Sequence, residues 1–197
     1  MRDLKLKPQV LQGRFVRLEP YEPALREAVR DALDCDPDSW SVFAASGQGE
    51  HFDGWWSRAL DEMAQGTRVA FAVRRLSDGA IVGTTSYLNI RDEHRGVEIG
   101  STFYGPDARG GPVNPECKLL LLGHAFEAGA IRVELITDAR NLRSQAAIAK
   151  LGAVREGVLR RHKITWTGHE RDTVVFSVIA DEWPQARAGL EDRLSAC

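Results

Sequence analysis

The sequence predicts one mixed α/β domain of the α+β kind, built on about seven strands with helices between them. Two observations predict this class. Residues 68–104 hold three strand-like patterns in a row, and beyond residue 105 helical and strand-like patterns alternate. The chain has 197 residues, of which 43% are hydrophobic. That length suits a single domain with a sizeable core.

The first part of the chain is expected to hold a mobile lead-in over residues 1–12, followed by a single domain over residues 13–197. Polar and apolar residues alternate over residues 14–18, which predicts a half-buried strand. Helical patterns follow over residues 22–33 and 52–63.

The middle of the chain predicts a meander of three strands over residues 68–74, 80–89 and 96–104. The first two are separated by Ser77-Asp78-Gly79, which is a hairpin turn signal. The elements expected after a Gly- and Pro-rich loop are a buried helix over 115–127, a strand over 131–137, a helix over 141–151, an antiparallel pair of strands over 154–165 and 171–179, and a helix over 181–194.

The composition argues against several classes of protein. The formal net charge of −2 lacks the basic excess that is usual in nucleic-acid-binding proteins. No apolar run approaches the roughly 20 residues needed to span a bilayer, and the first residues lack the apolar stretch of a signal peptide. Three distant cysteines and the lack of an HExxH pair favour a cytoplasmic protein without a metal site.

The loop before the expected helix 115–127 has features of a phosphate site. Gly110 and Gly111 allow close backbone approach to a helix N-terminus, whose unpaired N–H groups attract anions. Arg109 adds a bidentate donor, and Asn114 is expected to be the helix N-cap. A plain turn before a helix is the more common reading of such a loop. A local excess of basic residues downstream supports the anion site: Arg140, Arg143, Lys150, Arg155, Arg160, Arg161 and Lys163.

Several segments together resemble the GNAT acetyltransferase superfamily. Residues 108–122 (ARGGPVNPECKLLLL) resemble its phosphate loop and following helix. Residues 138–144 (DARNLRS) with 146–153 (AAIAKLGA) resemble its DxxNxxS…A(I)xxLGA signature, and residues 156–160 (EGVLR) resemble the EGxxR continuation. The segments RDTVVFS and EWP further along point to the RimJ/RimL-like branch, the relatives of ribosomal-protein N-acetyltransferases.

This resemblance covers about residues 12–195. It implies a mostly antiparallel sheet of about seven strands that splays near its middle, with helices on both faces. It also implies acetyl-CoA as cosubstrate and an amine as acceptor, either a protein N-terminus or a small amine or amino acid. The oligomeric state stays open, with a homodimer as one expectation.

The resemblance also implies site residues. Backbone groups of Thr102, Phe103 and Tyr104 would bind the pantetheine arm of the cosubstrate. Asn141 would hydrogen-bond the same arm, and Ser144 would lie near the sulfur. The residues expected around the pyrophosphate are Arg109, Gly110, Gly111, Val113 and Asn114.

The sequence departs from the family pattern at two points. Pro112 stands where the phosphate motif has its second glycine, and proline offers no N–H to a phosphate. The glutamate found after the EGxxR segment in some RimL-type enzymes is missing here, since Lys163 or a neighbour stands in its place. These departures support a second hypothesis, a non-catalytic acyl-CoA-binding protein. A generic nucleotide binder is a third.

The general base is expected to be Glu98, which alternates with apolar neighbours on its strand. Its alternative role is a cross-strand ion pair with Arg74 or Arg95. His162 is a second candidate base, since histidine titrates near neutrality. Ser144 is expected to protonate the leaving thiolate, or to serve only as a cap in the first turn of its helix.

The lack of a strong base favours an acceptor whose amine is easily deprotonated. An α-amine has a pKa about 2.5 units below that of lysine, so it needs less help to become neutral. The aromatic residues Trp40, Trp55 and Trp56 are expected to line the acceptor cleft. Because Trp55 and Trp56 point different ways on a helix, at least one of them is expected to belong to the core.

Overall fold

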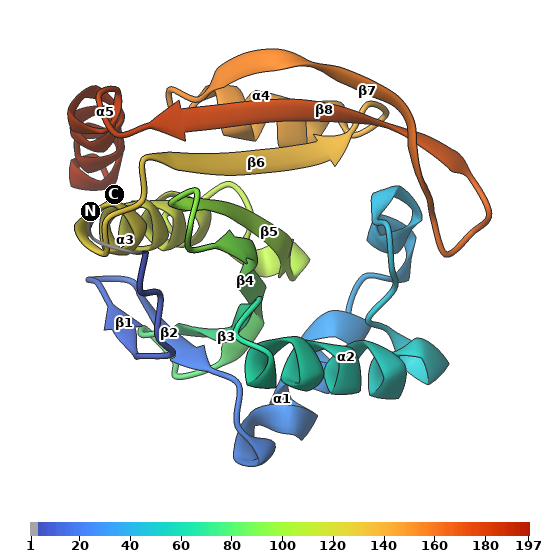
Figure 1. Ribbon diagram of the computed structural model, residues 1–197. Helices are drawn as coiled ribbons and strands as arrows, with labels where there is room; N and C mark the ends of the chain where they lie inside the picture. Colours follow the sequence, from blue (N-terminus) through green and yellow to red (C-terminus); the bar gives the residue numbers. More distant parts are fainter. Residues whose placement is uncertain (1–3) are drawn as a thin grey trace.

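The meander expected in the middle of the chain forms one half of an eight-stranded sheet. The computed structural model describes residues 4–197. Antiparallel pairs join β3 (Val69–Arg75), β4 (Ile81–Arg91) and β5 (Gly96–Tyr104) in order, and β2 (Val16–Pro20) adds to β3 (Figure 1). The eighth strand, β1 (Leu11–Gln12), was not predicted, because two residues are too few for an alternating pattern.

The second half of the sheet diverges from the first. The strand order is β1-β2-β3-β4-β5-β6-β8-β7, in which β7 (Val154–Ile164) and β8 (Glu170–Ile179) form an antiparallel pair beside β6 (Arg132–Asp138). Among the described strands, the only parallel pair is β5 with β6, and it runs just from Gly96 to Glu98 on β5. Beyond Glu98 the two strands separate (Figure 1), which confirms the predicted splay.

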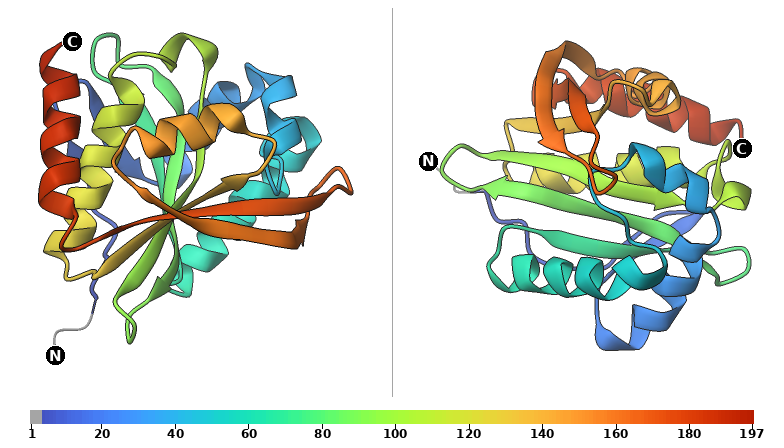
Figure 2. Two further views of the ribbon diagram at one scale, coloured as in Figure 1. Left: turned by 90° about the horizontal axis from the view of Figure 1, so that it is seen from above. Right: turned by 90° about the vertical axis from the view of Figure 1, so that its right-hand side faces the viewer.

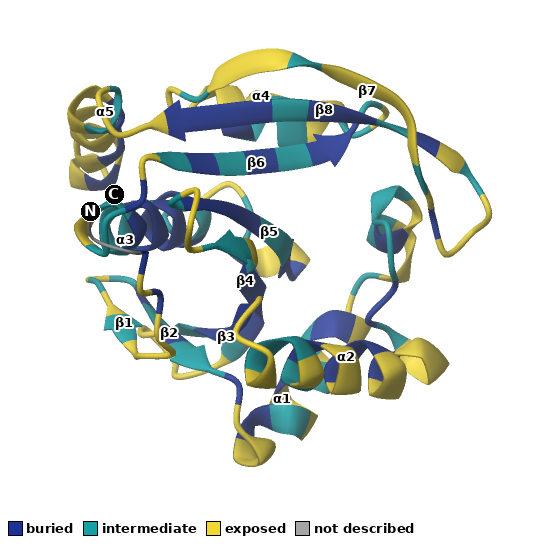
Figure 3. Ribbon diagram, viewed as in Figure 1, coloured by how far each residue is buried: buried dark blue, intermediate teal, exposed yellow. Residues whose placement is uncertain are grey.

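Helices cover both faces of the sheet, as Figure 2 shows. On one face lie α3 (Val113–Glu127) and α5 (Trp183–Ser195), whose Phe126 and Trp183 stack with centroids 5.5 Å apart, and α4 (Leu142–Ala149) adds Ile148 to the same core. On the other face α1 (Arg26–Asp34) and α2 (Phe52–Ala64) enclose a second core that is rich in aromatic residues. Figure 3 shows the buried strands between these two layers.

The helix starts differ from the expectation at α3. The helix begins at Val113 with Pro112 at its N-cap, so the prediction of Asn114 as the N-cap is wrong. Proline at the start of a helix loses no hydrogen bond, and its φ of −75° suits the first turn. The remaining helical segments are short 3-10 turns: η1 (Pro23–Leu25), η2 (Pro37–Val42), η3 (Gly49–His51) and η4 (Pro106–Ala108).

The described part of the expected lead-in packs against the domain. Residues 1–3 lie outside the described part, whereas Leu4 and Leu6 are buried in the core beside α3. The buried carboxylate of Glu116, in the first turn of α3, accepts hydrogen bonds from the backbone N–H groups of residues 14, 15 and 16 at 2.7 to 2.8 Å. These three bonds hold the start of β2 against the start of α3.

Candidate functional site

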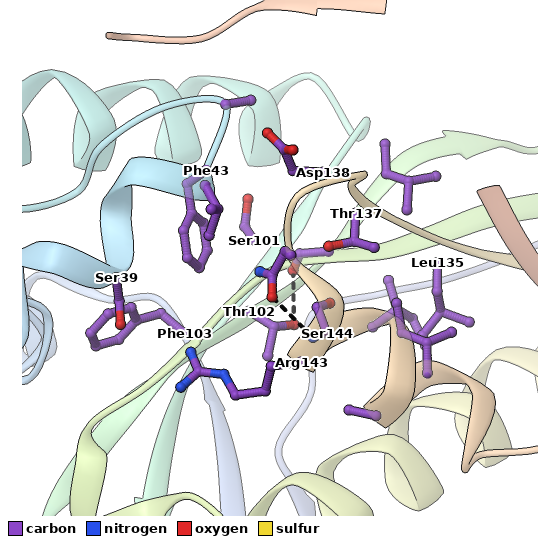
Figure 4. Close-up of a pocket in the computed structure, with 18 of the residues that line it drawn as sticks. Ser39, Phe43, Ser101, Thr102, Phe103, Leu135, Thr137, Asp138, Arg143 and Ser144 are labelled. Atoms are coloured by element: carbon purple, nitrogen blue, oxygen red, sulfur yellow. Dashed lines mark hydrogen bonds between the residues drawn. The ribbon is translucent and has the colours of Figure 1, made fainter. Parts of the chain in front are cut away.

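A cavity of about 370 Å³ opens where β5 and β6 diverge. That volume lies within the range of small-molecule sites. Figure 4 shows side chains from β5, β6 and α4 around it, including Thr102, Thr137 and Ser144. The cavity runs from the loop at Arg109 and Gly110 to Glu98. The site residues predicted from the sequence that line it are Trp40, Trp55, Glu98, Thr102, Phe103, Tyr104, Arg109, Gly110, Asn114, Asn141 and Ser144.

The loop end of the cavity holds the predicted phosphate residues in part. Gly110 has a φ of +79°, a conformation that favours glycine, and nothing lies within 4 Å of where its Cβ would stand. Arg109 donates from Nε to the Tyr104 carbonyl at 2.7 Å and from Nη1 to Asp36 Oδ2 at 2.6 Å. Two of its guanidinium nitrogens are therefore already engaged within the protein. Gly111 and Val113 do not line the cavity, and the Val113 side chain is buried in the core.

The open edge of β5 forms one wall. Because β6 pairs only up to Glu98, the later backbone groups of β5 on that edge have no strand partner among the described residues. A register shift opposite β4 accompanies Ser101, whose φ is +46°. Such bulges re-aim a strand beside functional sites. The unpaired edge therefore leaves backbone groups of Thr102 and Tyr104 without a strand partner among residues 4–197, and the Tyr104 carbonyl accepts a hydrogen bond from Arg109.

The start of α4 forms the facing wall. Asn141 is the N-cap, and its Oδ1 accepts a hydrogen bond from the Ser144 backbone N–H at 2.9 Å. The capping role considered for Ser144 thus belongs to Asn141. Both residues line the cavity, and the α4 residues Arg143 and Ser144 appear together in Figure 4.

Two buried carboxylates, Glu98 and Asp138, line the cavity, and the carboxylate of Asp138 is hydrogen-bonded to the Arg140 guanidinium. Glu98 is 5% exposed, and its Oε2 accepts a hydrogen bond from Asn89 Nδ2 at 2.7 Å. Burial raises the pKa of Glu98, although the charge of Lys163 and the bond from Asn89 partly oppose that rise. A raised pKa suits a group that accepts a proton near neutral pH.

The alternatives to Glu98 do not fit the structure. Arg74 donates to Glu19 and Arg95 donates to the Gly129 carbonyl, so the ion pair considered for Glu98 is absent within residues 4–197. The second candidate base, His162, is exposed and does not line the cavity.

All three tryptophans predicted for the acceptor cleft are buried in the aromatic core, and Trp40 and Trp55 also line the cavity. Trp40 stacks on Phe103 with centroids 4.9 Å apart, and both line the cavity. Trp55 lines it as well. Trp56 instead stacks on Tyr21 at 4.3 Å and lies away from the cavity, in line with the expectation that one tryptophan of this pair belongs to the core.

A second cavity, of about 610 Å³, meets the first at Glu98, Ser101 and Lys163. It lies between α2 and the β7–β8 hairpin, whose Trp166 donates from Nε1 to the Trp40 carbonyl at 2.9 Å. Glu98 therefore lines both cavities.

Lys118 is a cavity residue that the sequence did not predict. It is buried on α3, and its Nζ donates to Thr102 Oγ1 at 3.0 Å. Burial lowers the pKa of Lys118 to about 8. The signal available in the sequence was a single lysine in a helix that is otherwise apolar almost all round.

Two other kinds of feature, a metal-binding cluster and a membrane-spanning helix, are not found in the described part of the chain. Over residues 4–197, no group of three or more His, Cys, Asp or Glu side chains could hold a metal ion. Within the same part of the chain, no helix combines the length and apolar character that crossing a bilayer requires.

Comparisons with known proteins agree with this architecture. The family described as acetyltransferase (GNAT) domain matches residues 16–154. A T. thermophilus protein described as an acetyltransferase is 38% identical, with 96% of this chain and 99% of that chain covered and a TM-score of 0.86. A GCN5-related N-acetyltransferase from Brucella melitensis is 26% identical, with 98% and 88% covered and a TM-score of 0.88.

A further solved structure shares the fold. It is Mycobacterium smegmatis RimJ in complex with CoA-disulfide, 23% identical, with 94% of each chain covered and a TM-score of 0.80. None of the curated proteins compared with the chain matches it. Since the family match spans well over half of the sequence and agrees with the splayed sheet, the chain belongs to the GNAT acetyltransferase family.

Proposed function

We propose that this protein transfers the acetyl group of acetyl-CoA to a primary amine by direct attack in a ternary complex. The observation that carries the proposal is the meeting of two cavities at the buried carboxylate Glu98. One cavity has a loop and helix start suited to phosphates, and the other gives an acceptor separate access to the same carboxylate. Membership of the RimJ/RimL-like branch is part of the proposal.

The first cavity suits the cosubstrate. The Gly110 loop and the first turn of α3 would hold the pyrophosphate, with Arg109 and Asn114 beside it. The pantetheine arm would run along the open edge of β5 and past Asn141, and the thioester would then lie between Glu98 and Ser144, which both line the cavity. Pro112 has no backbone N–H, so the pyrophosphate would be bound by the other N–H groups of the loop and of the first turn of α3.

Each group then has one task in the transfer. Glu98 accepts a proton from the amine, directly or through water, because only a neutral amine attacks the thioester. One backbone N–H group on the open edge of β5, that of Tyr104, stabilises the oxyanion, a contribution of about 3 to 4 kcal/mol for one donor. The Gly105 N–H donates to the Val82 carbonyl on β4, so alternation along the strand directs the Tyr104 N–H to the open edge and the Phe103 N–H toward β4. Ser144 donates its hydroxyl proton to the thiolate as the C–S bond breaks, directly or through water, and takes up the surplus proton of the former amine nitrogen in exchange.

The acceptor would be a protein N-terminal α-amine or a small amine or amino acid. It would enter through the second cavity, against Trp55 and Trp166. An α-amine needs less help from the base than a lysine side chain does. A cytoplasmic location and a homodimer belong to the same proposal as expectations.

Thiol release from acetyl-CoA, measured over a panel of amino acids, peptides and polyamines, tests the proposal. Release that depends on the amine, with acetylated product found by mass spectrometry, would support it. Binding of acetyl-CoA without release across the panel would instead favour a non-catalytic acyl-CoA-binding protein.

A further inference from the structure

Arg171 is a buried cation that forms no ion pair with any carboxylate of residues 4–197. It lies at the start of β8, is 6% exposed, and lines the cavity that contains Glu98. Its Nε has no hydrogen-bond partner among residues 4–197. A buried charge without a partner costs several kcal/mol, so proteins seldom keep one for stability alone.

The two acids whose charges act on Arg171 are held by other residues. Both carboxylate oxygens of Asp138 accept hydrogen bonds from the Arg140 guanidinium, at 3.0 and 2.8 Å. Glu98 accepts from Asn89. Neither acid ion-pairs with Arg171 in this part of the chain, so its donors remain available on the cavity side.

A second cation stands beside Arg171. Lys163 pairs with it across the β7–β8 ladder, and Lys163 lines both cavities where they meet. Over residues 4–197 Lys163 also forms no ion pair with a carboxylate. The meeting point of the two cavities therefore presents Glu98 and Lys163, and Arg171 lies beside Lys163 on the wall of the first cavity.

This arrangement complements an acceptor that carries both charges. We propose that Arg171 and Lys163 bind a carboxylate of the acceptor, so that the substrate is a small amine bearing a carboxylate close to its amino group, as in an α-amino acid. The inference rests on the proposed function and narrows its acceptor class. Arginine suits this role because its planar fork binds a carboxylate through two parallel hydrogen bonds.

The cations are not placed for the phosphates of the cosubstrate. Those are expected at Arg109 and Gly110, at the other end of the cavity, whereas Lys163 also opens onto the second cavity. A protein N-terminus is the competing acceptor. It carries the amine but has an amide where the amino acid has its carboxylate, and so leaves both cations unpaired.

Matched acceptors separate these cases. The thiol-release assay would compare alanine, methionine and phenylalanine with their carboxamides, with the corresponding decarboxylated amines, and with short peptides that begin with the same residues. We expect kcat/KM for at least one free amino acid to exceed that of its carboxamide by about 10- to 100-fold, as for a hydrogen bond to a charged group.

Variants test whether Arg171 causes that preference. Arg171→Gln should lower kcat/KM for the amino acid more than for the carboxamide, so that the ratio of the two falls toward one, and Arg171→Lys should restore part of that ratio. Arg155→Gln, at an exposed arginine on β7 outside both cavities, is the matched control. Thermal unfolding of each variant reports whether it is folded.

The outcomes separate the two proposals. Equal turnover of amino acids, carboxamides and peptides by the unmodified protein would overturn the carboxylate site and leave the acetyltransferase function intact. A preference that persists in a folded Arg171→Gln variant would also overturn it. Acetyl-CoA binding with no turnover of any acceptor would overturn the proposed function, and the inference with it.

Discussion

The side-chain oxygen of Asn141 accepts a hydrogen bond from the backbone N–H of Ser144 at 2.9 Å, which joins the two predicted cosubstrate residues of α4. The bond leaves the Asn141 amide NH₂ and the Ser144 hydroxyl free to face the cavity that both residues line. The cap therefore positions both residues, and its contribution to stability can be separated from its contribution to binding.

Substitutions at Asn141 should separate those contributions. Asn141→Ala removes the cap and should lower the free energy of unfolding by about 1 kcal/mol, whereas Asn141→Ser keeps a capping oxygen and should change it little. Both lack the amide donor, so both should weaken acetyl-CoA binding by about 3- to 10-fold. Chemical denaturation and calorimetric titration measure the two quantities. An unchanged dissociation constant in both variants would remove Asn141 from the binding site.

Ser144→Ala should affect the chemical step. We expect kcat to fall by about 100-fold, because the thiolate loses its proton donor, with little change in acetyl-CoA affinity. Stability should stay within about 0.5 kcal/mol, since the backbone N–H that Asn141 caps is retained. Steady-state kinetics and titration check this. A loss of affinity at unchanged kcat would make Ser144 a binding residue only.

Glu98→Gln tests the base through the pH dependence of the rate. Glu98 must be ionised to accept a proton, so activity should rise with pH through its pKa, which burial places above the usual range for glutamate. The variant should lose about 100- to 10,000-fold in kcat/KM and the acidic limb of the profile. Glu93→Gln, in an exposed turn, is the control. An acidic limb that survives in Glu98→Gln would assign the base to another group.

Lys118→Met tests the buried lysine through stability. Burial lowers the pKa of Lys118 to about 8 in the folded protein, while the unfolded chain keeps the proton up to about pH 10.4. Between these values the unfolded state binds more protons, so wild-type stability rises with pH. At pH 7 the variant should be more stable by about 3 kcal/mol, and the difference should shrink toward pH 10.5. Parallel stability curves for the two proteins would contradict this.

The parts of the fold that were predictable are those whose patterns are long enough to be periodic. The strand over residues 68–74 was predicted within one residue of the bounds of β3, because its residues alternate strictly between two sets of positions. The 3-10 turns between α1 and α2 lack such a pattern and were missed. The candidate site likewise contains residues that a local pattern indicates and residues that it does not. Asn141 and Ser144 carry a short local motif, whereas the burial of Lys118 and Arg171 depends on strands and helices that meet only in the folded chain.

Glu116 has a consequence for how the domain assembles. Its carboxylate receives backbone N–H groups that lie 100 to 102 residues earlier in the chain. During synthesis at about 5 to 20 residues per second, the acceptor Glu116 is added several seconds after these donors. The hydrogen bonds can form only after that. The first turn of α3, which lines the cavity at Asn114, is thus held by the start of β2. A fragment that begins after β2 would leave the buried carboxylate of Glu116 without these three donors, at the helix start that lines the cavity.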